Sequence, residues 1–107
     1  MIEPTHWMFT YGTLKYERHG FPAEARGELR RHPAGYAVAR FDRHGTITGR
    51  LEQVADEDLA KYDARESGYR RRKIEVRGGP LAWTYEYTGG DFDTFPILAH
   101  GIWRENP

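Results

Sequence analysis

The chain alternates short apolar runs with polar stretches, and the spacing of its apolar positions predicts strands and one helix. The first run, residues 6–11, is aromatic and stops at Gly12, which predicts a buried strand entering a tight turn. Residues 36–41 and 46–51 alternate apolar with polar or small residues around a polar turn, the pattern of a β-hairpin. Residues 15–35 are polar and punctuated by glycine and proline, which predicts a long loop with one helical turn near residues 22–26.

The hydrophobic period changes after residue 55, where three acidic residues open a helical pattern. Leu59, Tyr62 and Glu66 follow at helical spacing, and Gly68 ends the segment. Strands are expected at residues 69–76 and 81–88, joined by a Gly-Gly-Pro turn. The tail from residue 89 has no clear period and is expected to pack across the body as irregular chain or a final short strand. Five strands and one helix indicate an α+β fold.

Composition narrows the possible classes of protein. The 107 residues fit a single domain spanning residues 1–107, and because 38% are hydrophobic and 14% aromatic, a small core rich in rings is expected. Sixteen basic and sixteen acidic residues cancel, which removes any global attraction to nucleic acid or an anionic membrane. Cysteine is absent, no stretch approaches the ~20 apolar residues of a membrane span, and residues 1–5 lack signal-peptide features, so a cytoplasmic location is expected.

Two further kinds of site are disfavoured by spacing. The five histidines are too far apart for the patterns that bind zinc, and neither a Walker loop nor a dinucleotide fingerprint is present, so no metal site and no cofactor are predicted. Residues 70–73 are all basic, but in a strand their side chains divide between two faces. A charged edge or solvated face is therefore favoured over nucleic-acid binding, and neither nucleic acid nor membrane is expected as a partner.

Glu66 is the most informative candidate residue. It lies four residues after Tyr62 and seven after Leu59, on the stripe that the helix should turn toward the core. A buried, unpaired carboxylate costs several kcal/mol, so such a group is normally paired, protonated or functional. The structural alternatives are a frayed helix end or a salt bridge to Arg65, Arg70 or Arg71.

The second candidate is the turn Tyr11-Gly12-Thr13-Leu14. Here a strand runs into a residue without a Cβ atom, which lets backbone N–H groups approach an anionic ligand closely. The turn would make a cradle for a carboxylate or an oxyanion. Plain turn chemistry is the alternative interpretation.

Several segments together resemble the γ-glutamylcyclotransferase-like family, also called AIG2-like. Residues 9–15, read as FTYGTLK, are similar to the family's FVYGTLR signature. Residues 47–54 resemble its VxGELYxV strand, with Arg50 in the position where the family usually has glutamate. Residues 59–71 are similar to its LAxLDxxEG...YxR segment, and residues 82–85 follow as the aromatic strand. The matches occur in the family's order over roughly residues 7–88.

The resemblance implies a small mixed five- to seven-stranded β-barrel flanked by one or two short helices, with a pocket at one end. It also implies that Glu66 is the catalytic acid/base, that residues 11–14 bind the substrate, and that Tyr11 or Tyr69 orients it. The implied reaction is attack of the α-amine of a γ-glutamyl group on its own γ-carbonyl, which gives 5-oxoproline and releases an amine. A monomer or homodimer acting on a γ-glutamyl-amine-like small molecule is expected. Because the segment before residue 36 is short and arginine-rich, a non-catalytic ligand-binding or inhibitory protein is the alternative.

Overall fold

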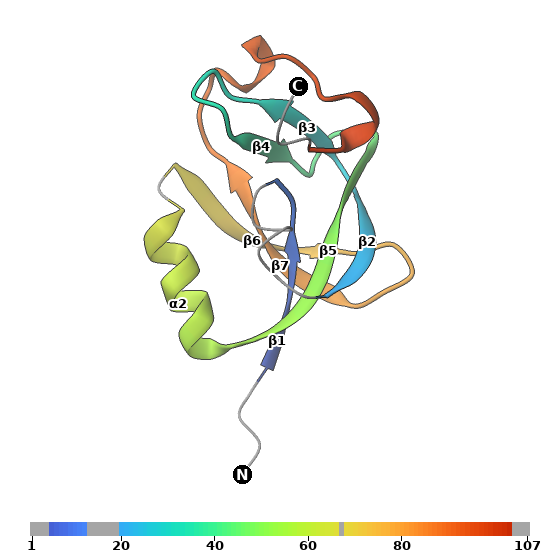
Figure 1. Cartoon of the computed structure of the whole chain (residues 1–107), viewed down its shortest axis with the longest axis vertical. Helices are drawn as coiled ribbons and strands as arrows, with labels where there is room; N and C mark the ends of the chain where they lie inside the picture. The colour runs from blue at the N-terminus through green and yellow to red at the C-terminus, as the bar shows by residue number, and fades with distance from the viewer. Residues whose placement is uncertain (1–4, 13–19, 67, 104–107) are drawn as a thin grey trace.

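The structure of the chain is a computed structural model that describes residues 5–12, 20–66 and 68–103. Strands, one α-helix and two short 3₁₀ turns follow one another within these residues, which confirms the α+β class (Figure 1). The elements in chain order are β1 (Thr5–Thr10), β2 (Phe21–Arg26), β3 (Glu28–Arg31), β4 (Ala37–Arg40), β5 (Thr46–Ala55), α2 (Asp56–Arg65), β6 (Tyr69–Glu75), β7 (Leu81–Tyr87), η1 (Phe92–Thr94) and η2 (Ala99–Gly101).

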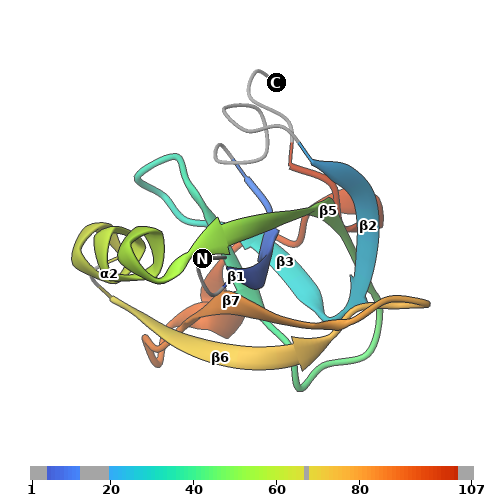
Figure 2. The same ribbon diagram turned by 90° about the horizontal axis from the view of Figure 1, so that it is seen from below.

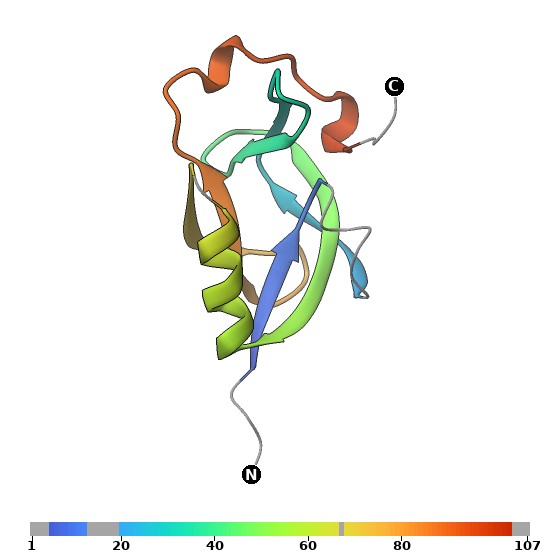
Figure 3. The same cartoon turned by 60° about the vertical axis from the view of Figure 1, so that its left-hand side comes forward.

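The strands form a mixed five-stranded sheet and a separate two-stranded hairpin. The order in the sheet is β2-β5-β1-β7-β6, and β1 is its central strand. β1 pairs antiparallel with β5 and parallel with β7, and the outer pairs, β2 with β5 and β6 with β7, are antiparallel. β3 and β4 form the hairpin, which lies beyond one end of the sheet beneath the C-terminal segment (Figures 1 and 3).

The five-stranded sheet curls so that its two outer strands approach each other (Figure 2). Ala25 of β2 forms an isolated antiparallel bridge with Val76, which directly follows β6. Beside it, the Arg77 N–H donates to the Glu24 carbonyl at 2.9 Å. No continuous ladder joins β2 to β6 in the described residues, so closure into the barrel that the resemblance implies is not detected.

The predicted loop at residues 15–35 is wrong for its second half, because residues 21–26 form β2 and residues 28–31 form β3. The helical turn expected near residues 22–26 is also absent. β2 is an edge strand in which only Ala25 is buried, so it lacks the alternating apolar pattern by which strands are recognised. An edge position also tolerates Pro22, which has no N–H for a second neighbour.

The predicted hairpin between residues 36–41 and 46–51 is wrong as well, although both strands exist. β4 pairs with β3, and β5 pairs with β1 and β2. Gly27 lies between β2 and β3, where the chain passes from the five-stranded sheet to the hairpin. A Cβ atom there would lie 2.7 Å from both the Arg40 carbonyl and the Ile47 side chain, so only glycine lets the chain pass this closely into the second sheet.

The helix and the last hairpin agree with the predicted pattern. α2 begins at Asp56, and the Ala55 N–H donates to the Asp58 carboxylate at 3.2 Å, which satisfies one free donor of the first turn. Leu59 and Tyr62 are buried against β1, β5 and β7. β6 and β7 form the expected hairpin around residues 78–80. With ten residues, α2 is too short for a bilayer crossing of about 20 apolar residues, as is every other described helix.

The core is small and rich in rings, as the composition predicts. Its largest fully buried side chains include Trp103, Tyr62 and Phe9. The tail packs across the β3–β4 hairpin as irregular chain with two 3₁₀ turns, which confirms the expectation for it (Figure 3). The Leu98 N–H donates to the Leu29 carbonyl at 2.9 Å, and Trp103 is buried beneath the Arg31 guanidinium.

Candidate functional site

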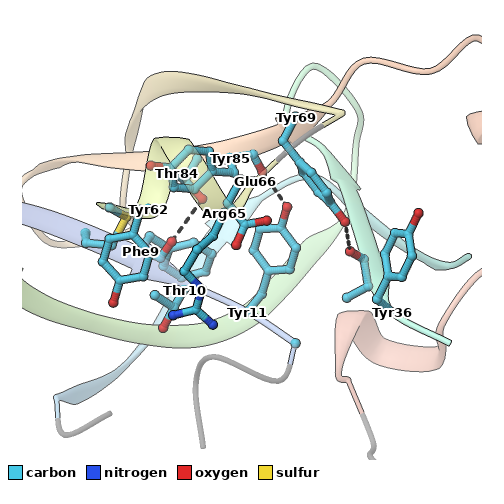
Figure 4. A pocket seen from close by; sticks show the side chains of 13 residues that line it. Phe9, Thr10, Tyr11, Tyr36, Tyr62, Arg65, Glu66, Tyr69, Thr84 and Tyr85 are labelled. Carbon is cyan, nitrogen blue, oxygen red and sulfur yellow. Dashed lines mark hydrogen bonds between the residues drawn. The ribbon is translucent and has the colours of Figure 1, made fainter. Parts of the chain in front are cut away.

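A pocket of about 320 Å³ opens beside the C-terminal end of α2, where the ends of β1, β4, β6 and β7 meet (Figure 4). Its described lining comes from five elements and from the turn after β1. The lining residues are Met8, Phe9, Thr10, Tyr11, Gly12, Tyr36, Ala37, Tyr62, Arg65, Glu66, Tyr69, Thr84 and Tyr85. Four of the predicted site residues, Tyr11, Gly12, Glu66 and Tyr69, are therefore brought to one pocket, whereas Thr13 and Leu14 lie outside the described residues.

The turn after β1 owes its shape to Gly12. Its φ is +71°, a left-handed conformation that an L side chain rarely adopts. A Cβ atom there would also lie 2.9 Å from the Ala37 Cβ, so glycine lets the turn pack against β4. Just before it, the partly buried Tyr11 ring lies 6.0 Å from the Phe41 ring, and its hydroxyl donates to the Tyr85 carbonyl. Both contacts hold the turn against the pocket.

Glu66 enters the pocket because the helix stops there. Its N–H still donates to the Tyr62 carbonyl at 3.0 Å, but its φ and ψ of −97° and 57° have left the helical region. The half-buried carboxylate consequently points into the pocket on the side of Tyr11 (Figure 4). The predicted helical stripe therefore holds for Leu59 and Tyr62 only, because α2 ends at Arg65 and Glu66 reaches the pocket as the residue that follows the helix.

The carboxylate of Glu66 makes no hydrogen bond or ion pair within the described part of the chain. The three arginines proposed as partners do not pair with it: Arg70 binds Glu86 at 3.2 Å and Arg71 binds Asp63 at 3.5 Å. Burial raises the pKa of Glu66 above its ordinary value, and the nearby Arg65 guanidinium offsets part of that rise. The group is thereby moved toward the pH range in which it can both accept and return a proton.

Tyr69 supports the rim of the pocket from the opposite side. Its hydroxyl donates to the Ala37 carbonyl at 2.6 Å, which ties β6 to β4 next to Gly12. Burial raises the pKa of Tyr69, so the phenol stays protonated and acts as a donor. The same holds for Tyr85, whose hydroxyl donates to Asp63 at 2.7 Å and whose pKa is raised by burial and by that carboxylate.

Two lining residues with evident chemistry were missed by the sequence prediction. Tyr36 stands at the rim and stacks on His32, with ring centroids 4.3 Å apart. Arg65 was considered only as an ion-pair partner of Glu66, yet it lines the pocket itself. Its position one residue before a candidate catalytic carboxylate was the available signal. Tyr36 offered none, because the wrong hairpin placed it away from Gly12.

The basic run at residues 70–73 makes contacts within the fold. Arg72 binds the buried Glu86 carboxylate at 3.0 Å. Arg71 and Lys73 lie over the Trp83 ring, at 4.8 Å and 5.0 Å from its centroid. These contacts explain the run by the packing of β6 on β7. Among the described residues, no group of three or more His, Asp or Glu side chains is arranged to hold a metal ion.

Comparison with known proteins adds a family to this geometry. The sequence model described as "Gamma-glutamyl cyclotransferase, AIG2-like" matches residues 8–105, nearly the whole chain. The chain belongs to this family. Membership confirms the resemblance drawn from residues 9–15, 47–54 and 59–71. No match was found among curated protein sequences.

Solved structures share the fold of this AIG2-like chain at low sequence identity. YkqA from Bacillus subtilis has a TM-score of 0.75 at 22% identity, and the match covers 94% of this chain but 40% of that one. An uncharacterized protein from Pyrococcus horikoshii has a TM-score of 0.66 at 15% identity, covering 92% and 89%. An AIG2-like protein from Mus musculus has a TM-score of 0.59 at 20% identity, covering 96% and 99%. The AIG2-like chain thus spans less than half the length of YkqA, and these likenesses concern the fold.

Proposed function

We propose that this chain is a γ-glutamyl cyclotransferase-type enzyme that releases 5-oxoproline from a γ-glutamyl amine, with Glu66 as general acid/base. The observation that carries the proposal is a half-buried carboxylate that has no hydrogen-bond or ion-pair partner among the described residues and faces the Tyr11–Gly12 turn across a pocket. Family membership supports the reaction class. A volume of about 320 Å³ suits a small molecule, at the lower end of the usual range for ligand pockets.

The reaction needs one proton carrier and one oxyanion site. The neutral α-amine attacks the γ-carbonyl carbon, a new C–N bond closes the five-membered ring, and the carbonyl oxygen gains negative charge. Glu66 accepts the proton that the attacking nitrogen loses and delivers it to the leaving nitrogen as the old C–N bond breaks. The products are 5-oxoproline and a free amine, and the carboxylate returns to its starting state.

We assign to the turn at Tyr11–Gly12 the binding of the substrate's γ-carbonyl oxygen. Backbone N–H groups at a glycine turn can approach a developing oxyanion without obstruction by a Cβ atom. Tyr11 remains protonated, because burial and the neighbouring Tyr69 and Glu66 raise its pKa. Its fixed ring forms a wall that helps hold the γ-glutamyl chain in a bent, reactive conformation.

The test is release of 5-oxoproline from a panel of γ-glutamyl amines by the purified chain. We expect turnover of at least one member, and a loss of about 10²- to 10⁴-fold in kcat for Glu66→Gln with the fold retained by circular dichroism. Glu75→Gln is the matched control, because Glu75 is an exposed carboxylate on β6 outside the pocket lining. A folded wild-type protein that binds panel members without converting them would support the non-catalytic alternative instead.

A further inference from the structure

The pocket carries one cation beside its candidate base. Of the described residues that line it, Arg65 and Glu66 are the two with a formal charge at neutral pH. They are adjacent in the chain at the end of α2, Arg65 exposed and Glu66 half-buried, and Figure 4 draws both among the side chains that line the pocket. They form no ion pair with each other, and Arg65 has no hydrogen-bond or ion-pair partner among the described residues. A guanidinium and a carboxylate thus share the pocket while each keeps its binding capacity.

A γ-glutamyl group presents the complementary pair of charges. Its Cα atom carries both the amine that must attack and a carboxylate, and two bonds separate the amine nitrogen from the carboxylate carbon, roughly 2.5 Å. A group that binds this carboxylate must therefore stand next to the base that takes the amine proton. Arg65 meets that condition by its place in the chain, whereas the Gly12 turn is needed on the other side for the γ-carbonyl.

A second polar group in the pocket also lacks a partner. Thr10, the last residue of β1, is 4% exposed, and its hydroxyl oxygen is buried with no hydrogen-bond partner among the described residues. A buried hydroxyl without a partner is costly, and such groups are rare in native proteins unless a ligand or water completes them. Thr10 lines the same pocket as Arg65, and its O–H can donate to a carboxylate oxygen.

We propose that Arg65, assisted by the Thr10 hydroxyl, binds the α-carboxylate of the substrate, so that the site selects γ-glutamyl compounds whose α-carboxylate is free. This assignment rests on the proposed function for the identity of the substrate. With the α-carboxylate bound by Arg65, the backbone N–H groups of the Gly12 turn are available to bind the reacting γ-carbonyl. The assignment also makes Arg65 a specificity-determining residue, because a planar guanidinium can bind both oxygens of a carboxylate but gains little from an amide.

The experiment compares an acid with its amide in two independent readouts. The first is kcat/KM for γ-glutamyl n-propylamide and for the same compound with its α-carboxylate converted to a carboxamide. The second is equilibrium binding of 5-oxoproline and of 5-oxoprolinamide, measured by NMR titration. We expect the wild-type protein to prefer the acid in both readouts by about 10- to 100-fold, the range of a charge-assisted hydrogen-bonded contact. Arg65→Met should abolish this preference by weakening the acid far more than the amide in both readouts.

Two further variants make the result specific. Lys61→Met removes the same charge from an exposed position on the same helix, outside the pocket lining, and should keep the wild-type preference. Thr10→Val removes the unpartnered hydroxyl with little change in shape and should reduce the preference by about 3- to 10-fold without loss of stability. Thr10→Val also tests the site if Arg65→Met fails to fold.

The outcomes separate this proposal from the proposed function. Turnover of acid and amide at equal rates would overturn the carboxylate site while supporting the cyclotransferase. Selective binding of 5-oxoproline that requires Arg65, with no turnover of any γ-glutamyl amine, would support the carboxylate site and contradict the enzyme. Absence of both binding and turnover would overturn both.

Discussion

Two carboxylates of this chain should respond to the same substitution with opposite effects on stability. Glu66 is half-buried and unpaired among the described residues, whereas Glu86 of β7 is 5% exposed and fully engaged. The Glu86 carboxylate accepts the Phe41 N–H at 2.8 Å and guanidinium N–H groups of Arg72 at 3.0 Å and Arg70 at 3.2 Å. We therefore compare Glu66→Gln with Glu86→Gln.

Glu86→Gln should lower the free energy of unfolding by about 2–3 kcal/mol. The amide keeps one acceptor oxygen but loses the charge and turns an NH₂ group toward a donor. Breaking a buried ion pair typically costs 3–5 kcal/mol, but the side chains of Arg70 and Arg72 are 68% and 36% exposed and can be rehydrated, which reduces the loss. In a domain of this size the change corresponds to a fall in Tm of roughly 8–15 °C.

Glu66→Gln should instead leave stability unchanged at pH 7 or raise it by up to about 1 kcal/mol, because the carboxylate has no partner among the described residues and Gln relieves the cost of its burial. The pH dependence of the free energy of unfolding gives a second, independent test of this effect. The pKa of Glu66 is raised in the folded state, so the folded protein binds more protons than the unfolded chain as pH rises above the ordinary value of 4.5. Wild-type stability falls across that window, and the advantage of Gln should appear there and vanish below it.

Urea denaturation followed by tryptophan fluorescence at pH 4 and pH 7 measures both variants. Glu75→Gln, on the exposed face of β6, is the control and should stay within about 0.5 kcal/mol of the wild type. A loss of 2 kcal/mol or more in Glu66→Gln at pH 7 would refute the reasoning, since it would identify Glu66 as a structural carboxylate. A Gln advantage that is greater at pH 4 than at pH 7 would contradict the sign of the pKa shift.

Three other substitutions test the site and its support. Arg65→Met should move the acidic limb of the pH–rate profile to higher pH, because the guanidinium lowers the pKa of Glu66, while kcat/KM measured across pH for Lys61→Met should keep that limb in place. Gly12→Ala should cost about 1–3 kcal/mol in urea denaturation and reduce kcat, because φ is +71° and the new Cβ would stand 2.9 Å from the Ala37 Cβ. Trp103→Ala should cost about 3–5 kcal/mol in the same denaturation assay, since its side chain is 2% exposed in the core.

The parts of the fold that could be predicted from sequence are those with a local signal. β1 and β7 are apolar or aromatic, α2 has an acidic first turn and a helical stripe, and the β6–β7 turn contains two glycines and a proline. β2 has no such signal. Its faces are largely exposed, and it is a strand because β5 pairs with it over six residues. Pairing of this kind is a tertiary interaction that a local pattern does not contain.

The same division applies to the site. Gly12 and Glu66 were predicted because a turn without a Cβ atom and a carboxylate on an apolar stripe are anomalies visible in sequence. Tyr36 was not, because its place at the rim depends on β4 pairing with β3 instead of β5. That exchange also brings Ala37 against Gly12 and beneath the Tyr69 hydroxyl. Because the predicted hairpin was wrong, the predicted site lacked the part of the pocket lining that Tyr36 and Ala37 form.

The pocket tyrosines bear on the proposed reaction, because they leave a single carboxylate to serve both of its proton transfers. The hydroxyls of Tyr11, Tyr69 and Tyr85 each donate to an oxygen of the protein, and burial raises the pKa of all three. A phenol that is held neutral and already donates its proton is a poor base near neutral pH. Within the described lining, Glu66 is then the group whose pKa moves toward neutrality, so the proposed reaction assigns to it the protons of both the attacking and the leaving nitrogen.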